Sequence, residues 1–359
     1  MKILIYGAGS IGNHYANGFV ERNHDVFVTD ISDISLNRMK KEIYPSRYGS
    51  WNNSITLVNY NNIKNFSADV VLIGTPPPSH LNLCIQSLNF HNPKIIHIEK
   101  PICTPDLSDL PNVIAQANKK GVILLNGYNH NLTKNVIAAK EIIKKYKFGK
   151  PLIMNSNVNE HWGGIFNAHP WIKDLKDTYL SNYNSGGGAM CEHSHGINLW
   201  QTFSEFLDMG KIKDLSCFLV FEESKDYIYD SIMQINVQSD NGLIGSISQD
   251  VVTVPHRKNL EIVFENGYIN IINNFEQNLD RIEYFINEEL QKIDFPKSRK
   301  DDFLGAIENI EKSFLEDKNF EKSMDFNFAV ETMFVIKSSL ESNKLKKRIN
   351  VMYTYDWSK

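Results

Sequence analysis

The sequence predicts an α/β fold in two domains: a doubly wound parallel sheet, then an α/β domain with a large, mostly antiparallel, open sheet. One observation is the length, because 359 residues exceed the roughly 150 residues of a typical domain. Short apolar runs alternate with helical stripes over residues 1–126, a pattern typical of parallel strands covered by helices. Strand patterns follow one another over residues 127–359, which favours antiparallel pairing. We therefore predict domains of residues 1–126 and 127–359.

The first domain begins with a continuous apolar run at residues 3–6, expected of a strand that is buried on both faces. Ile11, Tyr15 and Phe19 follow at four-residue spacing and predict a helix that packs on this strand. Further strands are predicted by apolar runs at residues 26–28, 70–73, 95–98 and 122–125.

The second domain opens with a predicted helix at residues 136–146, followed by a strand at 152–158 and a loop-rich stretch over 161–188. Four more strands are predicted at residues 215–221, 231–237, 243–249 and 260–264. A helical stripe follows near the C-terminus, and this helix could pack back on the first domain; its apolar residues are Ala329, Met333, Ile336 and Leu340.

Composition excludes several classes of protein. Lys and Arg number 38 against 42 Asp and Glu, a net charge of −4 that argues against a broad nucleic-acid-binding face. The four cysteines are scattered, so neither a disulfide framework nor a zinc ribbon is indicated. The first apolar run is too short for a signal peptide, and no run approaches the ~18 residues of a membrane span. We expect a cytoplasmic protein that binds neither nucleic acid nor membrane.

A glycine motif follows the first predicted strand and predicts a dinucleotide site of the Rossmann type. Gly7-Ala8-Gly9-Ser10-Ile11-Gly12 matches G-x-G-x-x-G. The glycines would permit a tight turn, a close approach of the pyrophosphate and close helix packing, with the helix N-terminus facing the anion. Asp30 ends the second strand, where a carboxylate would bind the ribose hydroxyl and repel a 2′-phosphate. NAD is therefore preferred over NADP. The alternatives are a glycine turn without ligand, and Asp30 as a surface turn residue.

Two further motifs each follow a predicted strand: Gly74-Thr75-Pro76-Pro77-Pro78-Ser79-His80 and Glu99-Lys100-Pro101. A third segment runs from Gly186 to His195. In this order they resemble the glucose-fructose oxidoreductase/inositol dehydrogenase (Gfo/Idh/MocA) family over nearly the whole chain. The resemblance implies an NAD-dependent dehydrogenase or reductase acting on a hydroxyl or carbonyl carbon of a sugar, cyclitol or sugar nucleotide. Its Glu-x-Ser-His variant leans toward bacterial surface-sugar biosynthesis.

Lys100 and His195 are the predicted catalytic residues. A lysine at the carboxyl end of a parallel strand points into the ligand crevice, where it can exchange the hydroxyl proton. A histidine ordinarily titrates near neutrality and can polarise or bind the same hydroxyl. The sequence departs from the family where many members carry aspartates, because Cys191 and Asn198 stand there. Asn129 and Asn131 stand where many members carry an arginine.

The other predicted site residues fall into two sets. We expect the cofactor to be bound by Gly7, Gly9, Ser10, Ile11, Gly12, Asp30, Thr75, Pro76, His80, Glu99 and Lys100. Glu99 would either orient Lys100 or bind the ribose side of the cofactor. We expect the substrate to contact Lys100, Tyr128, His161, Trp162, Trp171, Glu192 and His195. Core packing is the alternative for the tryptophans, and Gly186-Gly187-Gly188 is either a phosphate cradle or a flexible turn.

Two other functions remain open. One is a non-catalytic, dinucleotide-binding regulator on the same fold, suggested by the missing aspartates. The other is a metal-dependent hydrolase or lyase, because Cys191, His193 and His195 would share one face of a strand. No spacing matches a known zinc motif, and we predict no metal site. A bare face on an open sheet also predicts a homodimer or homotetramer.

Overall fold

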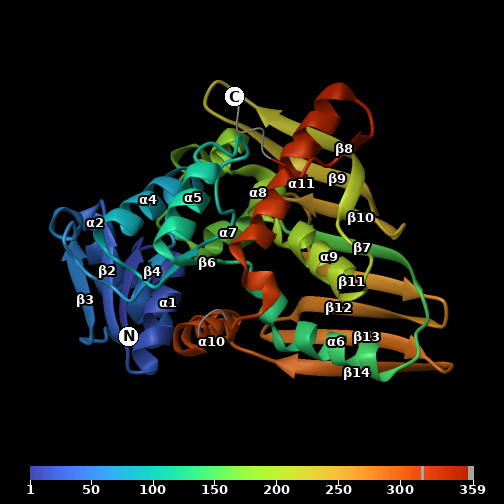
Figure 1. Ribbon diagram of the computed structural model, residues 1–359, viewed down its shortest axis with the longest axis horizontal. Helices are drawn as coiled ribbons and strands as arrows, with labels where there is room; N and C mark the ends of the chain where they lie inside the picture. The colour runs from blue at the N-terminus through green and yellow to red at the C-terminus, as the bar shows by residue number, and fades with distance from the viewer. Residues whose placement is uncertain (317–318, 355–359) are drawn as a thin grey trace. The chain divides into compact units, whose positions relative to one another are not determined.

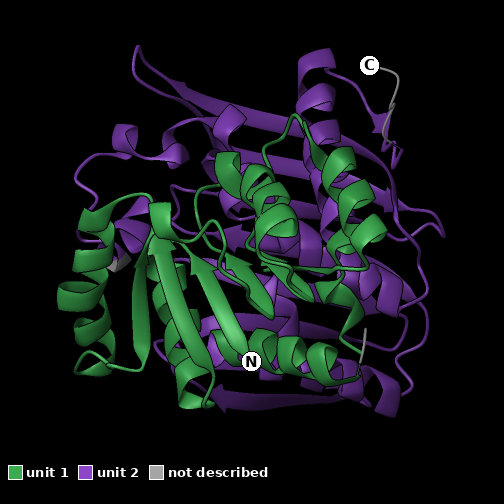
Figure 2. Ribbon diagram, turned by 60° about the vertical axis from the view of Figure 1, so that its left-hand side comes forward, with its two compact units in different colours: residues 1–127, 303–328 green, residues 128–302, 329–359 purple. Residues whose placement is uncertain are grey.

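The computed structural model describes residues 1–316 and 319–354. The chain forms two compact units (Figure 2). The first comprises residues 1–127 and 303–328, and the second comprises residues 128–302 and the described residues from 329 on. The first unit therefore takes in a segment far along the chain. The division of function at residues 126 and 127 stays a prediction.

The first unit is built on a parallel sheet of six strands in the order β3-β2-β1-β4-β5-β6 (Figure 1). The strands are β1 Lys2–Tyr6, β2 Asp25–Asp30, β3 Ile55–Asn59, β4 Val70–Ile73, β5 Ile95–Ile98 and β6 Ile123–Asn126. The chain reverses its direction of winding between β1 and β4, and ligands bind at the carboxyl ends of strands at such a point. The predicted doubly wound sheet is confirmed, although β3 was not predicted.

Helices join these strands. They are α1 Ser10–Glu21, α2 Asp33–Arg38, a π-helical turn Met39–Ile43, α3 Tyr44–Tyr48, α4 His80–Phe90 and α5 Leu110–Lys120. Short 3-10 turns lie at Tyr60–Asn62, Pro77–Ser79 and Lys322–Met324. The predicted stripe of α1 is confirmed, because Tyr15 and Phe19 are fully buried.

Helix α10, Asp301–Glu316, supplies most of the late segment of the first unit. Phe303 stacks on His14 with ring centroids 4.6 Å apart. A Cβ atom at Gly18 would lie only 2.2 Å from Ile307, so this glycine allows the two helices to touch. At the far end of this helix contact, Arg22 Nη2 lies 2.7 Å from Glu311 Oε2 and forms an ion pair with it. A late helix, α10, thus packs on the first unit, and the packing predicted for the helix at 329–340 stays a prediction.

The second unit is built on nine strands in the order β14-β13-β12-β11-β7-β10-β9-β8-β15. They are β7 Pro151–Asn159, β8 Ile212–Glu223, β9 Ile228–Ser239, β10 Ile244–Asp250, β11 Arg257–Phe264, β12 Gly267–Glu276, β13 Leu279–Ile286, β14 Glu289–Pro296 and β15 Ile349–Asn350. All neighbours are antiparallel except β7 and β10. The predicted mostly antiparallel sheet is confirmed, and β12 to β14 extend it beyond the predicted strands.

Helices of this unit cover one face of the sheet. They are α6 Lys134–Lys145, α8 Gly188–Glu192, α9 His195–Phe206 and α11 Phe326–Leu345. Trp200 of α9 is fully buried and donates its indole N–H to Met154 O at 2.8 Å. The stretch 161–188, predicted to be loop-rich, also contains α7 Trp162–Ala168 and 3-10 turns at Leu175–Asp177, Tyr179–Ser181 and Tyr183–Ser185.

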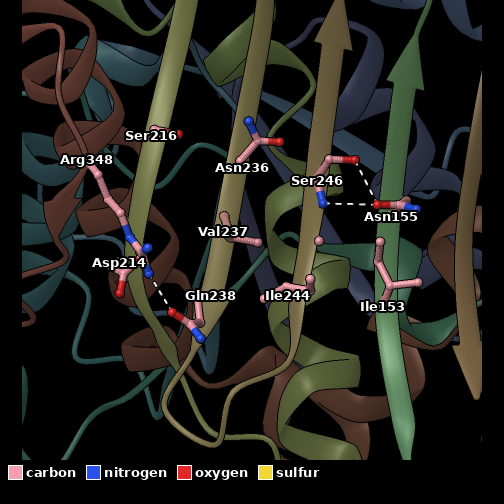
Figure 3. Close-up of a pocket in the computed structure, with 11 residues that line it drawn as sticks. Ile153, Asn155, Asp214, Ser216, Asn236, Val237, Gln238, Ile244, Ser246 and Arg348 are labelled. Carbon is pink, nitrogen blue, oxygen red and sulfur yellow. Dashed lines mark hydrogen bonds and ion pairs between the residues drawn. The ribbon is translucent and has the colours of Figure 1, made fainter.

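The opposite face of the sheet carries a hollow of about 560 Å³ over β7, β8, β9 and β10 (Figure 3). Its lining mixes apolar side chains with amides and hydroxyls. Asn155 Oδ1 accepts hydrogen bonds from Ser246 N at 3.1 Å and from Ser246 Oγ at 2.8 Å. This face is the open one that the strand pattern predicts.

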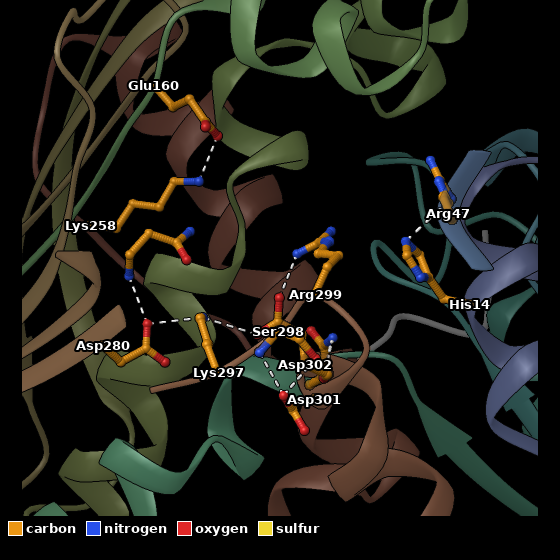
Figure 4. Close-up of polar contacts among 12 residues, drawn as sticks. His14, Arg47, Glu160, Lys258, Asp280, Lys297, Ser298, Arg299, Asp301 and Asp302 are labelled. Carbon is orange, nitrogen blue, oxygen red and sulfur yellow. Dashed lines mark hydrogen bonds and ion pairs between the residues drawn. The ribbon is translucent and has the colours of Figure 1, made fainter. Parts of the chain in front are cut away.

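A buried ion network fixes the segment between β14 and α10 (Figure 4). Lys297 Nζ lies 2.9 Å from Asp280 Oδ1 and 3.0 Å from Asp302 Oδ1. Arg299 adds a second cation at 2.7 Å from Asp302 Oδ2. Buried charges persist when they are paired in this way. Within residues 1–316 and 319–354, no helix is long and apolar enough to cross a membrane.

Candidate active site

The glycine motif forms the turn between β1 and α1. Gly7 has φ +104°, which favours glycine, and a Cβ atom at Gly12 would lie 1.9 Å from Gly7 O. A Cβ atom at Gly9 would have no neighbour within 4 Å. Gly7 and Gly12 are therefore required by the fold. Gly9 faces open space beside the N-terminus of α1, where a pyrophosphate would be received.

Asp30 ends β2 and holds this turn. Its Oδ2 accepts a hydrogen bond from Ala8 N at 2.9 Å, and its Oδ1 accepts one from Ser32 N at 2.9 Å. Each carboxylate oxygen can accept a further bond, so Asp30 can also receive ribose hydroxyls. The residues present fit a dinucleotide, and the negative charge disfavours a 2′-phosphate.

Arg47 of α3 is a residue of this site that the sequence analysis missed. Its Nη1 donates to Ser10 O and its Nη2 donates to Ser10 Oγ, both at 2.9 Å. Nη1 also lies 3.2 Å from His14 Nε2 (Figure 4). The guanidinium thus brings a positive charge to the first residue of α1. No local motif marks Arg47, because its position depends on a contact across 37 residues.

The Thr75 motif follows β4, and its histidine lies inside the unit. His80 is fully buried, with Nε2 2.6 Å from Thr75 O and Nδ1 3.0 Å from Pro101 O. Burial lowers the pKa of His80, although these backbone contacts oppose the shift. Pro76 is exposed and Thr75 Oγ1 lies 2.6 Å from Ser79 Oγ. We expect His80 to brace the two loops rather than touch the cofactor as predicted.

In the motif after β5, the glutamate is buried whereas the lysine is only half-buried. Glu99 is buried and accepts a hydrogen bond from Tyr15 OH at 2.9 Å, and its Oε1 lies 3.4 Å from His97 Nε2. Burial and the neighbouring carboxylate raise the pKa of Tyr15 well above its ordinary value. Lys100 follows at the carboxyl end of β5, half-buried and joined to Pro101 by a cis peptide bond. Glu99 therefore faces the interior of the unit.

His195 lies in the second unit, at the start of α9, beside residues 128–131. The ring of His130 stacks on it with centroids 3.8 Å apart and planes 12° from parallel. The rings of Tyr128 and His195 meet edge to face with centroids 5.5 Å apart, and Tyr128 OH donates a hydrogen bond to Ser194 Oγ at 3.0 Å. The structure thus brings Tyr128 and His195 together as predicted site residues, and adds His130.

Two of the residues that depart from the family motifs, Asn131 and Asn198, contact each other. Asn131 Nδ2 donates to Asn198 Oδ1, and Asn198 Nδ2 donates to Thr332 Oγ1 at 2.8 Å. Asn198 is fully buried. A neutral amide pair therefore occupies the place where the resemblance implies an arginine and an aspartate. Cys191 is also fully buried, inside the unit rather than on its surface.

The remaining predicted substrate residues lie in the second unit, from the residue before α7 to the last residue of α8. Trp162 packs with Leu180, Ala189 and Val251, so its position supports the alternative of core packing. His161 is exposed, and its Nδ1 accepts a hydrogen bond from Gly163 N and caps α7. Half-buried residues complete the set: Trp171, whose ring meets the His169 ring at 5.2 Å, and Glu192, which accepts a hydrogen bond from Tyr179 OH at 3.1 Å.

The glycine run before α8 is closely packed. A Cβ atom at Gly187 would lie 2.4 Å from the backbone oxygens of Tyr179 and Leu180. A Cβ atom at Gly188 would lie 2.0 Å from Asp230 Oδ1. Protein atoms thus fill the space around these two glycines, which favours a packed turn over a phosphate cradle.

The second unit also contains an ion pair that the sequence analysis did not predict. Glu160 Oε2 lies 2.6 Å from Lys258 Nζ (Figure 4). Burial acts to raise the pKa of Glu160, but the Lys258 ammonium and the neighbouring His193 outweigh it and leave the pKa lowered. Glu160 directly follows β7 and Lys258 lies in β11, so the pair becomes visible only when these strands are adjacent.

The proposed alignment of three metal ligands is wrong. Cys191 lies in α8, His195 begins α9 and His193 lies between the two helices, so the strand geometry is absent. Among the described residues no group of three or more histidines, cysteines and acids could hold a metal ion.

Comparison with known proteins assigns the first unit. The model of the oxidoreductase family with an NAD-binding Rossmann fold (Gfo/Idh/MocA) matches residues 1–128. No curated protein sequence matches the chain. The family match confirms the predicted enzyme class, an NAD-dependent oxidoreductase, and NAD as the cofactor.

Solved structures share the fold along the chain. An NAD-binding oxidoreductase from Klebsiella pneumoniae is 15% identical, covers 98% of both chains and has a TM-score of 0.76. Levoglucosan dehydrogenase in complex with NADH and levoglucosan is 15% identical, with 98% of this chain and 99% of that chain covered and a TM-score of 0.77. The WlbA dehydrogenase from Bordetella pertussis, in complex with NADH and UDP-GlcNAcA, is 15% identical, covers 98% of both chains and has a TM-score of 0.71.

At these identities the likeness concerns the fold, while the family match rests on the sequence itself. The glycine motif, Asp30 and the motifs that follow β4 and β5 all lie within the matched residues. Residues 1–128 are thus similar in sequence to the Gfo/Idh/MocA family of oxidoreductases with an NAD-binding Rossmann fold.

Proposed function

We propose that the protein transfers a hydride between NAD and a hydroxyl or carbonyl carbon of a sugar, a cyclitol or a sugar nucleotide. The observation that carries this proposal is the half-buried Lys100 at the carboxyl end of β5, in the unit that holds the glycine turn and Asp30. Levoglucosan and UDP-GlcNAcA, bound by two proteins of the same fold, support a sugar-type substrate. NAD, when bound, supplies the acceptor or donor of the hydride.

Lys100 is the proposed proton carrier. In the oxidation direction its side chain takes the proton of the substrate hydroxyl, and its ammonium then stabilises negative charge on that oxygen. His195 is the proposed ligand of the same hydroxyl, because an imidazole can donate or accept a hydrogen bond. Ser10 and the backbone after Gly9 would receive the pyrophosphate, and Asp30 the adenosine ribose.

The buried amide pair of Asn131 and Asn198 is proposed to bring no charge to the site. Both side chains are neutral amides; Asn131 Nδ2 donates to Asn198 Oδ1, and Asn198 Nδ2 donates to Thr332 Oγ1. A carboxylate or phosphate at this place would find no cationic partner in either asparagine. A role in surface-sugar biosynthesis remains the broader proposal, as does a cytoplasmic location.

The test is a panel of sugars, cyclitols and sugar nucleotides, screened with NAD and with NADP for absorbance of the reduced cofactor. We expect turnover with NAD. Lys100→Met should lower kcat at least about 100-fold, because a positioned proton carrier typically contributes that much. The exposed Lys119 provides the matched control, and Lys119→Met should leave kcat unchanged.

Two outcomes would contradict the proposal. Full turnover by Lys100→Met would show that the proton passes elsewhere. If NAD binds in a direct titration but no compound reduces it, even in a single turnover, the protein would be a dinucleotide-binding regulator instead.

A further inference from the structure

We infer that His130 is a positioning residue, whose ring stacks on His195 and fixes that imidazole in the orientation in which it meets the substrate hydroxyl. The inference deepens the proposed function and rests on it, because it concerns the role proposed for His195. The two rings lie face to face, with centroids 3.8 Å apart and planes 12° from parallel. A ring that is covered on one face in this way cannot turn about its side-chain bonds without losing the contact.

The stack belongs to a series of contacts between two segments of the second unit. Tyr128 OH donates to Ser194 Oγ at 3.0 Å on one side of the stack. Asn131 Nδ2 donates to Asn198 Oδ1 on the other side. The backbone that carries each ring is therefore held on both sides, so the stack is a fixed feature of the unit.

The support beneath His130 is also rigid. His130 lies in the 3-10 turn Asn129–Leu132, and the neighbouring Asn131 and Leu132 are buried. Thr133 Oγ1 donates to His130 O at 2.9 Å. Buried neighbours and a hydrogen-bonded carbonyl leave the turn little freedom, so the ring of His130 is presented in one place.

The stack orients His195 in a way that needs no charge. A carboxylate that accepts a ring N–H commonly orients a functional histidine. Cys191 and Asn198 occupy the positions where the resemblance implies aspartates, and both are fully buried. Asn198 directs its amide to Asn131 and Thr332. A flat ring against the face of His195 orients it by contact rather than by charge, and this function needs only an aromatic side chain at position 130.

The experiment compares His130→Phe, which keeps a flat ring, with His130→Leu and His130→Ala, which do not. His256 is an exposed histidine of the same unit, so His256→Ala is the matched control. Each protein is made with ring-labelled histidine, and NMR relaxation reports the mobility of the His195 ring, assigned with His195→Gln. Steady-state kinetics follow on the substrate found in the panel, and thermal melting checks that each variant is folded.

We expect the His195 ring to be restricted in the wild type, His130→Phe and His256→Ala, and mobile in His130→Leu and His130→Ala. We expect kcat to fall about tenfold in His130→Leu with KM nearly unchanged, and to return to within threefold of wild type in His130→Phe. A folded His130→Leu with a restricted His195 ring and full kcat would overturn the inference, as would a His130→Phe as impaired as His130→Leu. If His195→Gln keeps full activity, the proposed role of His195 fails, while ring mobility still reports on the stack itself.

Discussion

Asp230 of β9 is a carboxylic acid without access to solvent. Its Oδ2 accepts a hydrogen bond from Met190 N at 2.7 Å, and its side chain is fully buried. Burial raises the pKa of Asp230 to about 8, and the backbone N–H only partly opposes this. Gly188, with φ +77°, leaves the space that the carboxyl group fills. The acid is therefore protonated in the folded protein at neutral pH.

Ionisation of Asp230 should make the free energy of unfolding fall as pH rises. The unfolded side chain ionises near pH 4, whereas the folded one ionises near pH 8, so folding takes up a proton between these values. Stability should therefore fall as pH rises from about 4 to about 8, at about 1.4 kcal/mol per pH unit from this group. Asp230→Asn should remove this slope. Urea unfolding at pH 5, 6 and 7 measures the free energy of unfolding of both proteins. If this free energy changes with pH equally in the wild type and in Asp230→Asn, the assignment is contradicted.

Single residues differ in how far the sequence can predict them. Gly7, Gly12 and Asp30 were predictable, because a local motif states the backbone geometry that they serve. Arg47 was not, since its contact with Ser10 depends on the placement of α3. The environment of Trp162 was not predictable either, because burial in a core and exposure in a binding loop begin with the same residue type.

At the scale of elements, the turn between β1 and α1 contains one glycine that we expect to serve binding, Gly9, and one that the fold requires, Gly12. Gly9→Ala adds a methyl group into open space, at a residue whose φ of −83° any side chain tolerates. The same group at Gly12 meets Gly7 O at 1.9 Å. We expect Gly9→Ala to melt like the wild type but to bind NAD at least tenfold more weakly, about 1.4 kcal/mol.

Gly12→Ala is the matched variant of the pair, and we expect it to lower the melting temperature because the helix must move away from the turn. Calorimetric titration with NAD and thermal melting measure the two effects separately. Unchanged NAD affinity in a folded Gly9→Ala would show that the dinucleotide does not approach this backbone.

The strands were predictable where burial makes their pattern unambiguous. β4 and β5 have the predicted bounds, since every residue is buried and the apolar runs are continuous. β3 is an edge strand with one buried residue, Ile55, so its sequence carries little periodic signal. β14 is almost wholly exposed, and only pairing with β13 identifies it as a strand. Helix α10 was missed as well, although Phe303, Ile307 and Ile310 lie at helical spacing; only its packing on α1 depends on distant residues.

At the scale of the whole molecule, the first unit needs its late segment. Phe303, Ile307 and Ile310 of α10 are almost fully buried, and burying each such side chain contributes about 1.5–3 kcal/mol. Together this is comparable to the total stability of a typical domain, about 5–15 kcal/mol. We expect residues 1–127 alone to melt without cooperativity and to bind a hydrophobic dye. A version joined to residues 301–328 by a flexible linker should melt cooperatively. Equal melting of the two fragments would contradict this.

The open face of the nine-stranded sheet leads to a prediction about assembly. Phe218 and Val220 of β8, with Ile232 of β9, stand on this face and remain 69%, 49% and 37% exposed. Val220 and Ile232 are paired across the two strands, so the apolar surface is continuous. Contiguous exposed apolar surface on a sheet is typical of a protein interface, and an open sheet can bury it against a second copy.

We propose that the protein is a homodimer or homotetramer assembled through this face, and expect Phe218→Asp to reduce its mass in solution. A charge placed in a buried interface must be desolvated without a partner, so assembly should weaken at least about 100-fold, about 2.7 kcal/mol. Val254, 76% exposed in a loop of the same unit, provides Val254→Asp as the matched control. Light scattering across a dilution series measures the mass. A monomeric wild type would refute the proposal, and an unchanged mass in Phe218→Asp would place the interface on another surface.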